Sequence, residues 1–205
     1  HALRAADLCK QMLAYAGKGR FTVEILDLNV LIEDITQLLE VSIQKKAVIL
    51  SILSRPLPAI NADASQLRQV IMNLIINASE SMPGREGHIT LSTGTVDVTE
   101  AYLTAEQYQG ECVSGKYVSL EVTDNGDGMD GATLGRIFDP FFTTPPHGSG
   151  LGLAAVLGIV RRHQGTIKVT SAPGRGTSVK LLLPAAVAAA PAPKPPAPAN
   201  QDWHR

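Results

Sequence analysis

Four short motifs follow one another along this chain, and together they constrain its fold more than any other feature. They are Asn73-Leu-Ile-Ile-Asn77-Ala78, Asp124-Asn-Gly126-Asp-Gly128, Phe138-Asp-Pro140-Phe141-Phe142 and Gly148-Ser-Gly150-Leu-Gly152-Leu153. Each motif alone is a weak signal, because glycine-rich segments occur wherever a turn needs positive φ. In this order they combine a helix that carries amides, a carboxylate, a hinge and a glycine loop. We therefore expect a single pocket to be built from all four.

The length and composition fit one domain with appendages. The chain has 205 residues, of which 44% are hydrophobic and only 4% aromatic, as in an aliphatic α/β domain. A formal net charge of -1 argues against nucleic acid or an anionic membrane as a partner. No apolar run approaches ~20 residues and no signal peptide opens the sequence, so we predict no direct membrane contact. Cys9 and Cys112 match no CxxC spacing, which favours a reducing, cytoplasmic location.

Hydrophobic periodicity predicts an alternation of helices and strands. One helix begins at Asp27 or Asn29 and runs to about Lys45, and another begins at Asp63 or Ser65, where a short polar side chain can cap it. A third covers 151–163, and the strands fall at 48–53, 88–96, 117–123, 166–171 and 177–183. The polar stretch 99–115 is expected to be a surface excursion with a short helix near 104–108. The predicted fold is an α/β (α+β) two-layer sandwich: a mixed, mostly antiparallel sheet with helices on one face.

Both ends of the chain differ from this domain. Ala5, Leu8, Met12 and Tyr15 fall three and four residues apart, which predicts an apolar helical stripe. That helix either belongs to a helical hairpin or dimer bundle, which we favour, or lies on the domain itself. Beyond Pro184 the sequence is almost entirely Ala and Pro, a composition typical of an extended tether. The expected division is 1–19 for the bundle helix, 20–184 for the main domain and 185–205 for the tail.

Asp124 and the asparagine pair carry the first part of the predicted chemistry. Asp124 ends a strand expected to be central and buried, so its carboxylate needs a partner, and the exocyclic amine of adenine can donate to it. A simple tight turn is the alternative, whereas a calcium loop lacks the later Glu ligand. Asn73 and Asn77 lie one helical turn apart near the apolar face. Asn77 offers a neutral oxygen to Mg²⁺ and Asn73 can orient water or phosphate, unless backbone groups satisfy both amides.

The glycine motif and the phenylalanine motif complete the pocket. Gly148, Gly150 and Gly152 leave main-chain amides uncovered at the start of a helix, where the macrodipole also favours anions. No Gly-Lys-Ser/Thr follows, so this is not a Walker loop. The phenylalanines, Phe138 among them, are interpreted as a latch for a mobile lid over 129–149, with plain core packing as the alternative. The four motifs together predict a pocket for ATP.

These residues resemble the catalytic ATP-binding domain of bacterial sensor histidine kinases, within the gyrase, chaperone, kinase and MutL (GHKL) superfamily with its Bergerat fold. The resemblance covers about 21–184 and includes the closing Gly176-Thr177. Its named boxes are the N box (Gln69–Glu80), the G1 box (Asp124–Gly128), the F box (Arg136–Thr144) and the G2 box (Gly148–Leu153).

The resemblance implies a role for each site residue. Asp124 would read adenine, with Thr177 supporting it through water, while Asn77 would bind Mg²⁺ and Asn73 would lie at the phosphates. Residues 4–16 resemble the second helix of the dimerisation and phosphotransfer hairpin, and the tail resembles linkers that precede a receiver domain. The full set of predicted nucleotide contacts is Asn73, Asn77, Asp124, Gly126, Gly128, Met129, Phe138, Gly148, Gly150, Leu151, Gly152, Leu153 and Thr177, with Asn73 and Asn77 as the catalytic pair.

Three departures from the family pattern bear on activity. Pro145-Pro146 stands where many relatives carry a Lys, and Glu80 stands where some carry a base near the phosphates. The third departure is that none of the five histidines has the expected context of a phosphoacceptor, which is an exposed helix with an acidic neighbour. They are His1, His88, His147, His163 and His204. The acceptor is therefore expected upstream of this sequence.

The predicted reaction is γ-phosphoryl transfer from MgATP to a histidine nitrogen, which depends on positioning and charge neutralisation. The predicted partners are an upstream phosphoacceptor histidine domain, a response regulator or receiver domain, and a second copy of the full-length protein in a homodimer. Two alternatives stay open. A GHKL-type ATPase would normally carry a Glu at the position of Asn73, and a degenerate nucleotide-binding module would agree with Pro145.

Overall fold

The computed structural model describes residues 21–43, 47–82, 87–105, 108–109, 112–143 and 150–186. The predicted helix over 2–16, the Pro145-Pro146 pair, Gly148 and most of the Ala/Pro tail lie outside these ranges. None of the helices in the described part of the chain is both long enough and apolar enough to cross a membrane.

One five-stranded sheet organises the described residues, with the order β2-β4-β5-β7-β6. Its strands are β2 (Ala47–Leu53), β4 (Gly87–Val98), β5 (Gly115–Asp124), β6 (Thr166–Ser171) and β7 (Thr177–Pro184). The β2–β4 pair is parallel, and the β4–β5, β5–β7 and β6–β7 pairs are antiparallel. The predicted mixed, mostly antiparallel sheet is therefore confirmed, and β5 is its central strand.

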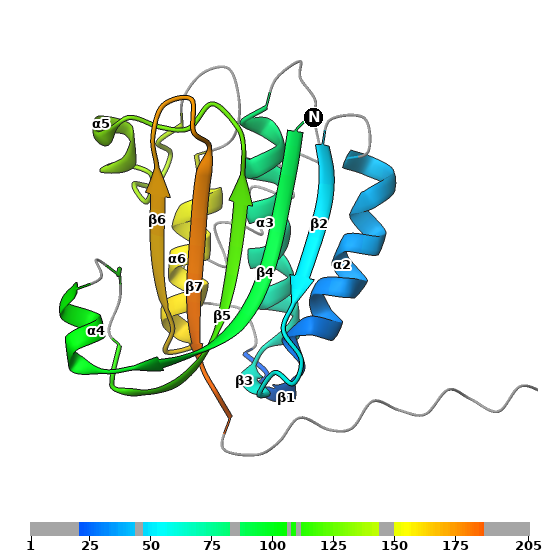
Figure 1. Cartoon of the computed structure of the whole chain (residues 1–205), viewed down its shortest axis with the longest axis vertical. Helices are drawn as coiled ribbons and strands as arrows, with labels where there is room; N and C mark the ends of the chain where they lie inside the picture. The colour runs from blue at the N-terminus through cyan, green and yellow to red at the C-terminus, as the bar shows by residue number, and fades with distance from the viewer. Residues whose placement is uncertain are drawn as a thin grey trace, which may run out of the picture.

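Three helices cover one face of this sheet, as Figure 1 shows. They are α2 (Leu28–Ile43), α3 (Ala64–Glu80) and α6 (Gly152–Arg162), with α3 in the middle and in contact with both neighbours. The main core lies between the two layers and is aliphatic: its fully buried side chains include Ile35, Ile71, Leu91, Leu120 and Ile159. On the opposite face of the sheet, the described residues form no helix layer (Figure 1). The predicted two-layer sandwich is confirmed.

Polar side chains define where the helices begin. Asp27 accepts hydrogen bonds from the N–H groups of Asn29 and Val30, at 2.9 and 3.4 Å. Asp63 likewise accepts from Ser65 and Gln66 at the start of α3. These caps satisfy N–H groups that have no partner within their own helix. Of the two candidates that the sequence offered at each site, the aspartate is the cap in both.

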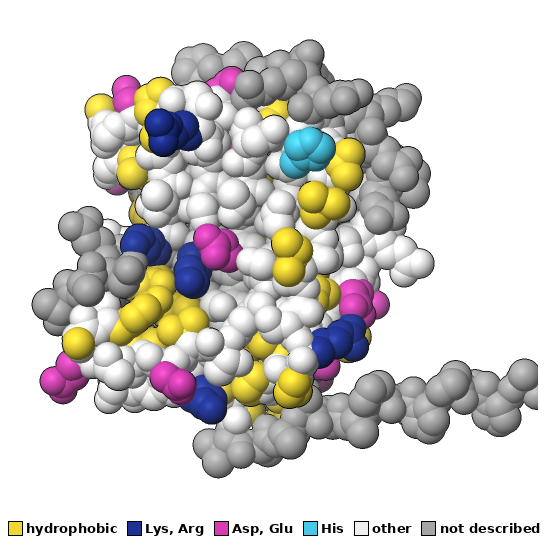
Figure 2. Space-filling model, in the orientation of Figure 1, with side chains coloured by type: hydrophobic (Ala, Val, Ile, Leu, Met, Phe, Trp, Pro, Cys, Tyr) yellow, Lys and Arg dark blue, Asp and Glu magenta, His cyan; other side chains and the backbone are white. Residues whose placement is uncertain are grey.

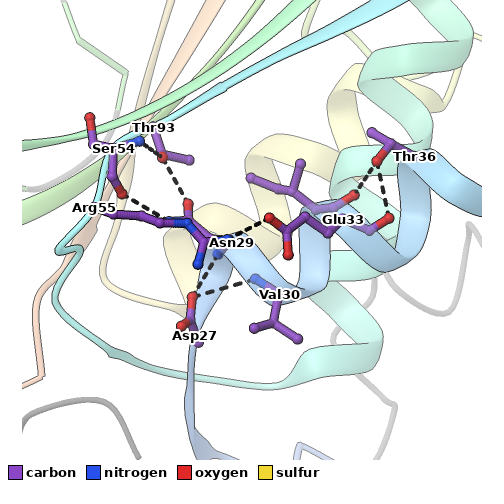
Figure 3. A network of polar contacts seen from close by, with 9 residues as sticks. Asp27, Asn29, Val30, Glu33, Thr36, Ser54, Arg55 and Thr93 are labelled. Atoms are coloured by element: carbon purple, nitrogen blue, oxygen red, sulfur yellow. Dashed lines mark hydrogen bonds and ion pairs between the residues drawn. The ribbon is translucent and has the colours of Figure 1, made fainter. Parts of the chain in front are cut away.

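Asn29 also ties α2 to the sheet through a buried polar network (Figure 3). Its amide donates to the Ser54 carbonyl at 2.9 Å, and its side-chain oxygen accepts from the Thr93 hydroxyl at 2.8 Å. Thr93 in turn accepts from the Ser54 N–H at 3.1 Å. Asn29 and Thr93 are both buried, and each member of this network is satisfied by another member.

Four small elements differ from the sequence prediction. The strands β1 (Glu24–Leu26) and β3 (Ile60–Ala62) pair antiparallel in a separate two-stranded sheet that was not predicted. They have three residues each, too few for an alternating pattern to stand out. The short helix expected near 104–108 is α4 (Glu100–Ala105), and a further short helix, α5 (Gly131–Leu134), lies within the predicted lid.

Candidate functional site: a nucleotide pocket at the end of the central strand

Asp124 lies where β5 ends, next to α3. Its side chain is 8% exposed, and its Oδ1 accepts hydrogen bonds from the Gly126 N–H at 2.7 Å and from the Ser81 hydroxyl at 3.1 Å. A buried carboxylate is costly to keep ionised, and these two donors offset part of that cost. A carboxylate fixed in this way is a specific acceptor for a ligand amine. The burial predicted for Asp124 is confirmed.

The loop after Asp124 is held between α3 and the turn that joins β6 to β7. The N–H of Asp127 donates to the Ser81 carbonyl at 3.0 Å, and Asp127 accepts from the Gly174 N–H at 2.6 Å. Gly128 has φ 66°, and a Cβ there would collide with the carbonyl of Ala172. Only glycine fits this close approach of two main chains. The loop therefore has a fixed position relative to Asp124.

Thr177 lies directly beside Asp124, because the two residues are partners in the β5–β7 register. Its hydroxyl is 3.0 Å from the hydroxyl of Ser171, which also donates to the Gly176 carbonyl and accepts from the Met129 N–H at 2.9 Å. Met129 is half-buried at the start of the predicted lid. Thr177 and Met129, two predicted contact residues, are thus joined through one serine.

Asn77 lies on α3 about one turn before Ser81, and Asn73 about two turns before it. A Cβ at Gly152 would lie 3.5 Å from both polar atoms of the Asn77 amide, so the start of α6 meets Asn77 directly. The Nδ2 atom of Asn73 is buried and has no hydrogen-bond partner among the described residues. An unpaired buried amide is costly, and a bound polar group would satisfy it. This arrangement fits the predicted phosphate and Mg²⁺ end of the pocket.

The chemistry of these donors suits Mg²⁺ held largely by phosphate and water. Within the described ranges, no three His, Cys, Asp or Glu side chains gather in a way that could hold a metal ion. Mg²⁺ commonly keeps several waters and binds through substrate phosphates, with few protein ligands. A single neutral oxygen from Asn77 is compatible with that mode of binding.

Gly150 and Leu151 precede α6, and the phenylalanine motif contacts them. The carbonyl of Gly150 accepts from the Phe141 N–H at 2.9 Å. Gly150 has φ 69°, and a Cβ there would lie 2.8 Å from the Cα of Phe141. Leu151 is buried, and no side chain caps α6. The first N–H groups of α6 therefore lack a side-chain acceptor, as expected for a helix end that receives phosphate.

The three phenylalanines do not act as one unit. Phe138 is half-buried and packs on the main core, as does Leu153, so the core interpretation holds for Phe138. Phe142 lies under the guanidinium of Arg136, whose Cζ is 4.3 Å from the ring centroid. Phe141 is 61% exposed and has φ 66°, which is unusual for a residue other than glycine. Only Phe141 retains the exposed position expected of a latch.

Two contributing residues were missed in the sequence. Ser81 supports Asp124 although 43 positions separate them, and Ser171 joins Met129 to Thr177. Both are common residues outside the four motifs, and pairing over such a distance leaves no local pattern. The cap position of Ser81, at the end of the helix that carries Asn77, was the only available signal.

The fold and this site define an ATP-binding α/β sandwich domain. The profile described as "Histidine kinase-, DNA gyrase B-, and HSP90-like ATPase" matches residues 62–187. The chain therefore belongs to this family, and the resemblance seen in the four motifs is confirmed.

Sensor kinases are among its relatives. The chain is 36% identical over 189 residues to the sensor kinase CckA of Brucella abortus (strain 2308), covering 91% of this chain and 20% of that protein. It is 35% identical over 176 residues to the signal transduction histidine-protein kinase AtoS of Escherichia coli (strain K12), covering 85% of this chain and 26% of that one. The chain thus spans about a fifth to a quarter of the length of these two relatives.

Solved structures of histidine kinases also match this chain. Full-length ShkA, crystallised in complex with AMPPNP, matches with a TM-score of 0.71 at 26% identity, covering 91% of this chain and 37% of that one. The nucleotide-free catalytic domain of histidine kinase ThkA matches with a TM-score of 0.62 at 25% identity, covering 82% of this chain and 97% of that domain. The described fold is therefore that of the histidine kinase ATP-binding catalytic domain.

Proposed function

We propose that this chain is the catalytic part of a sensor histidine kinase and transfers the γ-phosphoryl group of ATP to a histidine upstream of it. The observation that carries the proposal is the buried carboxylate of Asp124, fixed by Ser81 and Gly126 at the end of the central strand. Membership of the family and the likeness to sensor kinases support it. The wider family includes ATPases, so the transfer step goes beyond what membership alone implies.

In this proposal the nucleotide lies along α3, between β5 and α6. Adenine donates its amine to Asp124, with Thr177 supporting the carboxylate through water. The phosphates meet the N–H groups at the start of α6, while the buried Nδ2 of Asn73 gains the acceptor that it lacks among the described residues. Asn77 would hold Mg²⁺, which when bound neutralises phosphate charge. Gly128, Met129, Phe138 and Leu153 would border the site.

Transfer requires an acceptor that the described residues do not provide. The bond between the γ-phosphorus and its bridging oxygen breaks, a phosphorus–nitrogen bond forms on the acceptor, and ADP leaves. Of the two described histidines, His163 is buried and both of its ring nitrogens lie in hydrogen bonds, and His88 opens β4. We therefore propose an acceptor in an upstream helical hairpin, to which 1–19 would belong.

The remaining proposals concern the larger protein. The catalytic domain would extend over 20–184, and 185–205 would link it to a following domain. A response regulator or receiver domain would take the phosphoryl group from the acceptor, and the full-length protein would be a homodimer. We place the domain in the cytoplasm, where ATP is available and the thiols of Cys9 and Cys112 stay reduced.

Calorimetric titration with ATP and Mg²⁺ tests the nucleotide site. Asp124→Asn removes the charge but keeps the shape, and the loss of a charged hydrogen bond should weaken ATP binding about ten- to a hundredfold. Asp97→Asn is the matched control, because Asp97 is exposed on β4. Asn77→Ala should lower affinity with Mg²⁺ present and have little effect in EDTA. Equal affinity of the Asp124→Asn variant and the parent chain would rule out the site.

A second experiment tests the transfer step. The chain is extended upstream through its hairpin and incubated with γ-labelled ATP. The kinase proposal requires label on the protein that acid removes and alkali does not. ADP release without labelled protein would identify an ATPase, and binding without either product would identify a nucleotide-binding module, the alternative that Pro145 favours.

A further inference from the structure

Two hydroxyl side chains lie in a row with Asp124 across neighbouring strands of the sheet. Thr177 of β7 is the register partner of Asp124 of β5 and also of Ser171 of β6. Residues paired across antiparallel strands point to the same face. Asp124 accepts from Ser81 at the end of α3, so the row lies on the helix side of the sheet, opposite the face drawn in Figure 2. The row therefore belongs to the wall of the nucleotide pocket.

Ser171 uses every hydrogen-bonding position of its hydroxyl. A serine hydroxyl can donate one hydrogen bond and accept two. The carbonyl of Gly176, 2.9 Å away, can only accept, so the Ser171 proton goes to it. The N–H of Met129, also 2.9 Å away, can only donate and takes one acceptor position. One acceptor position is left for the remaining neighbour, the Thr177 hydroxyl at 3.0 Å.

These contacts fix the direction of the Thr177 hydroxyl. Because the Ser171 proton is already used, Thr177 is the donor in the contact between the two hydroxyls. The single proton of Thr177 then points to Ser171, and its oxygen keeps only acceptor positions for the pocket. Thr177 is half-buried, so that oxygen is not closed off from a ligand or a water molecule. An ionised Asp124 and Thr177 thus lie side by side as two acceptors.

The direction of this chain of hydroxyls is held by main-chain groups at its far end. To reverse it, Ser171 would have to donate to Thr177 and leave the carbonyl of the buried Gly176 without this hydrogen bond, which is costly. A hydroxyl without such neighbours can rotate and either donate or accept. Ser171 therefore removes that choice from Thr177.

We propose, building on the nucleotide function proposed above, that Ser171 is a positioning residue that makes the base end of the pocket selective for an amine over a carbonyl. The amine of adenine has two N–H groups. One donates to Asp124, and the other donates toward Thr177, directly or through one water. Hypoxanthine presents a carbonyl at that position, which faces two acceptors and finds no donor in the chain. A site built to accept from a ligand N–H rejects the analogue that lacks it, because its acceptors stay unpaired.

The test compares ATP with inosine triphosphate, which has a carbonyl in place of the adenine amine, by calorimetric titration with Mg²⁺ present. The ratio of the two dissociation constants measures the selectivity. Ser171→Ala frees the Thr177 hydroxyl to donate, and loss of one oriented hydrogen bond should lower the selectivity about fivefold or more. Thr170→Ala is the matched control, because this exposed neighbour on β6 points to the other face and should keep the parent selectivity.

Two further variants show whether the Ser171 hydroxyl acts through Thr177. Thr177→Val should lower the selectivity by itself, and adding Ser171→Ala to it should lower the selectivity no further. Ser171→Thr keeps a hydroxyl and should keep the parent selectivity. Thermal melting checks that each variant is folded.

The outcomes separate this proposal from the nucleotide function on which it builds. If the parent chain binds no ATP, both fail. If the parent binds ATP, three results overturn the role of Ser171 alone: parent selectivity in Ser171→Ala, a further fall when Ser171→Ala is added to Thr177→Val, or equal losses in Ser171→Thr and Ser171→Ala.

Discussion

At the scale of single residues, Ser81 decides how Asp124 is presented to a ligand. It donates from its hydroxyl to Asp124 Oδ1 at 3.1 Å and accepts from the Asp127 N–H through its carbonyl at 3.0 Å. The same residue caps the helix that carries Asn77. Ser81 thus joins Asp124 through its hydroxyl, and the following loop and α3 through its main chain.

Ser81→Ala should therefore weaken ATP binding without unfolding the domain. Loss of one hydrogen bond to a carboxylate costs about 1 to 2 kcal/mol, which corresponds to about a five- to thirtyfold rise in the dissociation constant. Calorimetric titration measures this, with Ser51→Ala on β2, an exposed serine, as the control. Unchanged affinity in Ser81→Ala would show that the serine hydroxyl is not needed to position the carboxylate.

His163 is a second residue with a defined consequence. Its Nε2 accepts from the Asp63 N–H at 3.0 Å, so the hydrogen rests on Nδ1, which faces the Ile159 carbonyl at 2.8 Å. Burial lowers the pKa of this imidazole, although the hydrogen bond to Ile159 and the nearby Asp63 oppose that shift. The folded domain therefore keeps His163 neutral at pH values where the unfolded chain has begun to protonate it.

This difference predicts a pH dependence of stability. The unfolded chain binds more protons than the folded domain as pH falls below the ordinary histidine pKa of about 6.5. The free energy of unfolding should therefore fall from pH 7 toward pH 5, by at most about 1.4 kcal/mol per pH unit for this group. Urea unfolding across that range measures it.

Two histidine variants identify the source of that slope. His163→Gln can still accept from Asp63 and should flatten the slope, while His88→Gln at the exposed start of β4 should keep it. If the slope persists in His163→Gln, groups other than His163 cause it.

Asp63 affects stability in a lower pH range. Burial disfavours its charge, but hydrogen bonds from Ser65, Thr22 and Gln66 hold its pKa below the usual value. The contribution of Asp63 to the free energy of unfolding is therefore lost only below about pH 4.

At the scale of elements, one glycine before α6 and one within it differ in how much space surrounds them. Gly150, just before the helix, needs positive φ and lies against the backbone of Phe141, whereas a Cβ at Gly158 inside the helix would meet nothing within 4 Å. Gly150→Ala should displace the Phe141 segment and weaken ATP binding tenfold or more. Gly158→Ala should raise the free energy of unfolding by about 0.5–1 kcal/mol and leave ATP affinity alone. Titration and urea unfolding of both variants test the pair.

The helices and strands also show which parts of the fold can be predicted from the sequence. The long periodic segments were predicted within about two residues at most ends, and β6 (Thr166–Ser171) agreed at both, because buried periodicity is a local signal. The short strands β1 and β3 gave no such signal, and α4 lies several residues before its predicted place. At the site, Asp124 and Gly128 could be read from their motif. Ser81 and Ser171 could not, since only the completed fold brings them to Asp124 and Thr177.

At the scale of the whole molecule, the helix layer is joined to the sheet by polar as well as apolar contacts. The buried network of Asn29, Ser54 and Thr93 links α2 to β2 and β4 at the end of the sheet away from Asp124 (Figure 3). The catalytic pocket and this network thus occupy different regions of the same two layers. Stability and nucleotide binding should therefore be separable.

Thr93→Val tests that separation. Valine has nearly the same shape but leaves Asn29 Oδ1 and the Ser54 N–H without their partner, which should lower the free energy of unfolding by about 1–3 kcal/mol. Thr95→Val, an exposed position two residues along β4, should change it by less than about 0.5 kcal/mol. Urea unfolding measures both, and calorimetric titration at 25 °C should give the parent ATP affinity for each. A Thr93→Val variant of full stability that bound ATP weakly would mean that the network shapes the pocket itself.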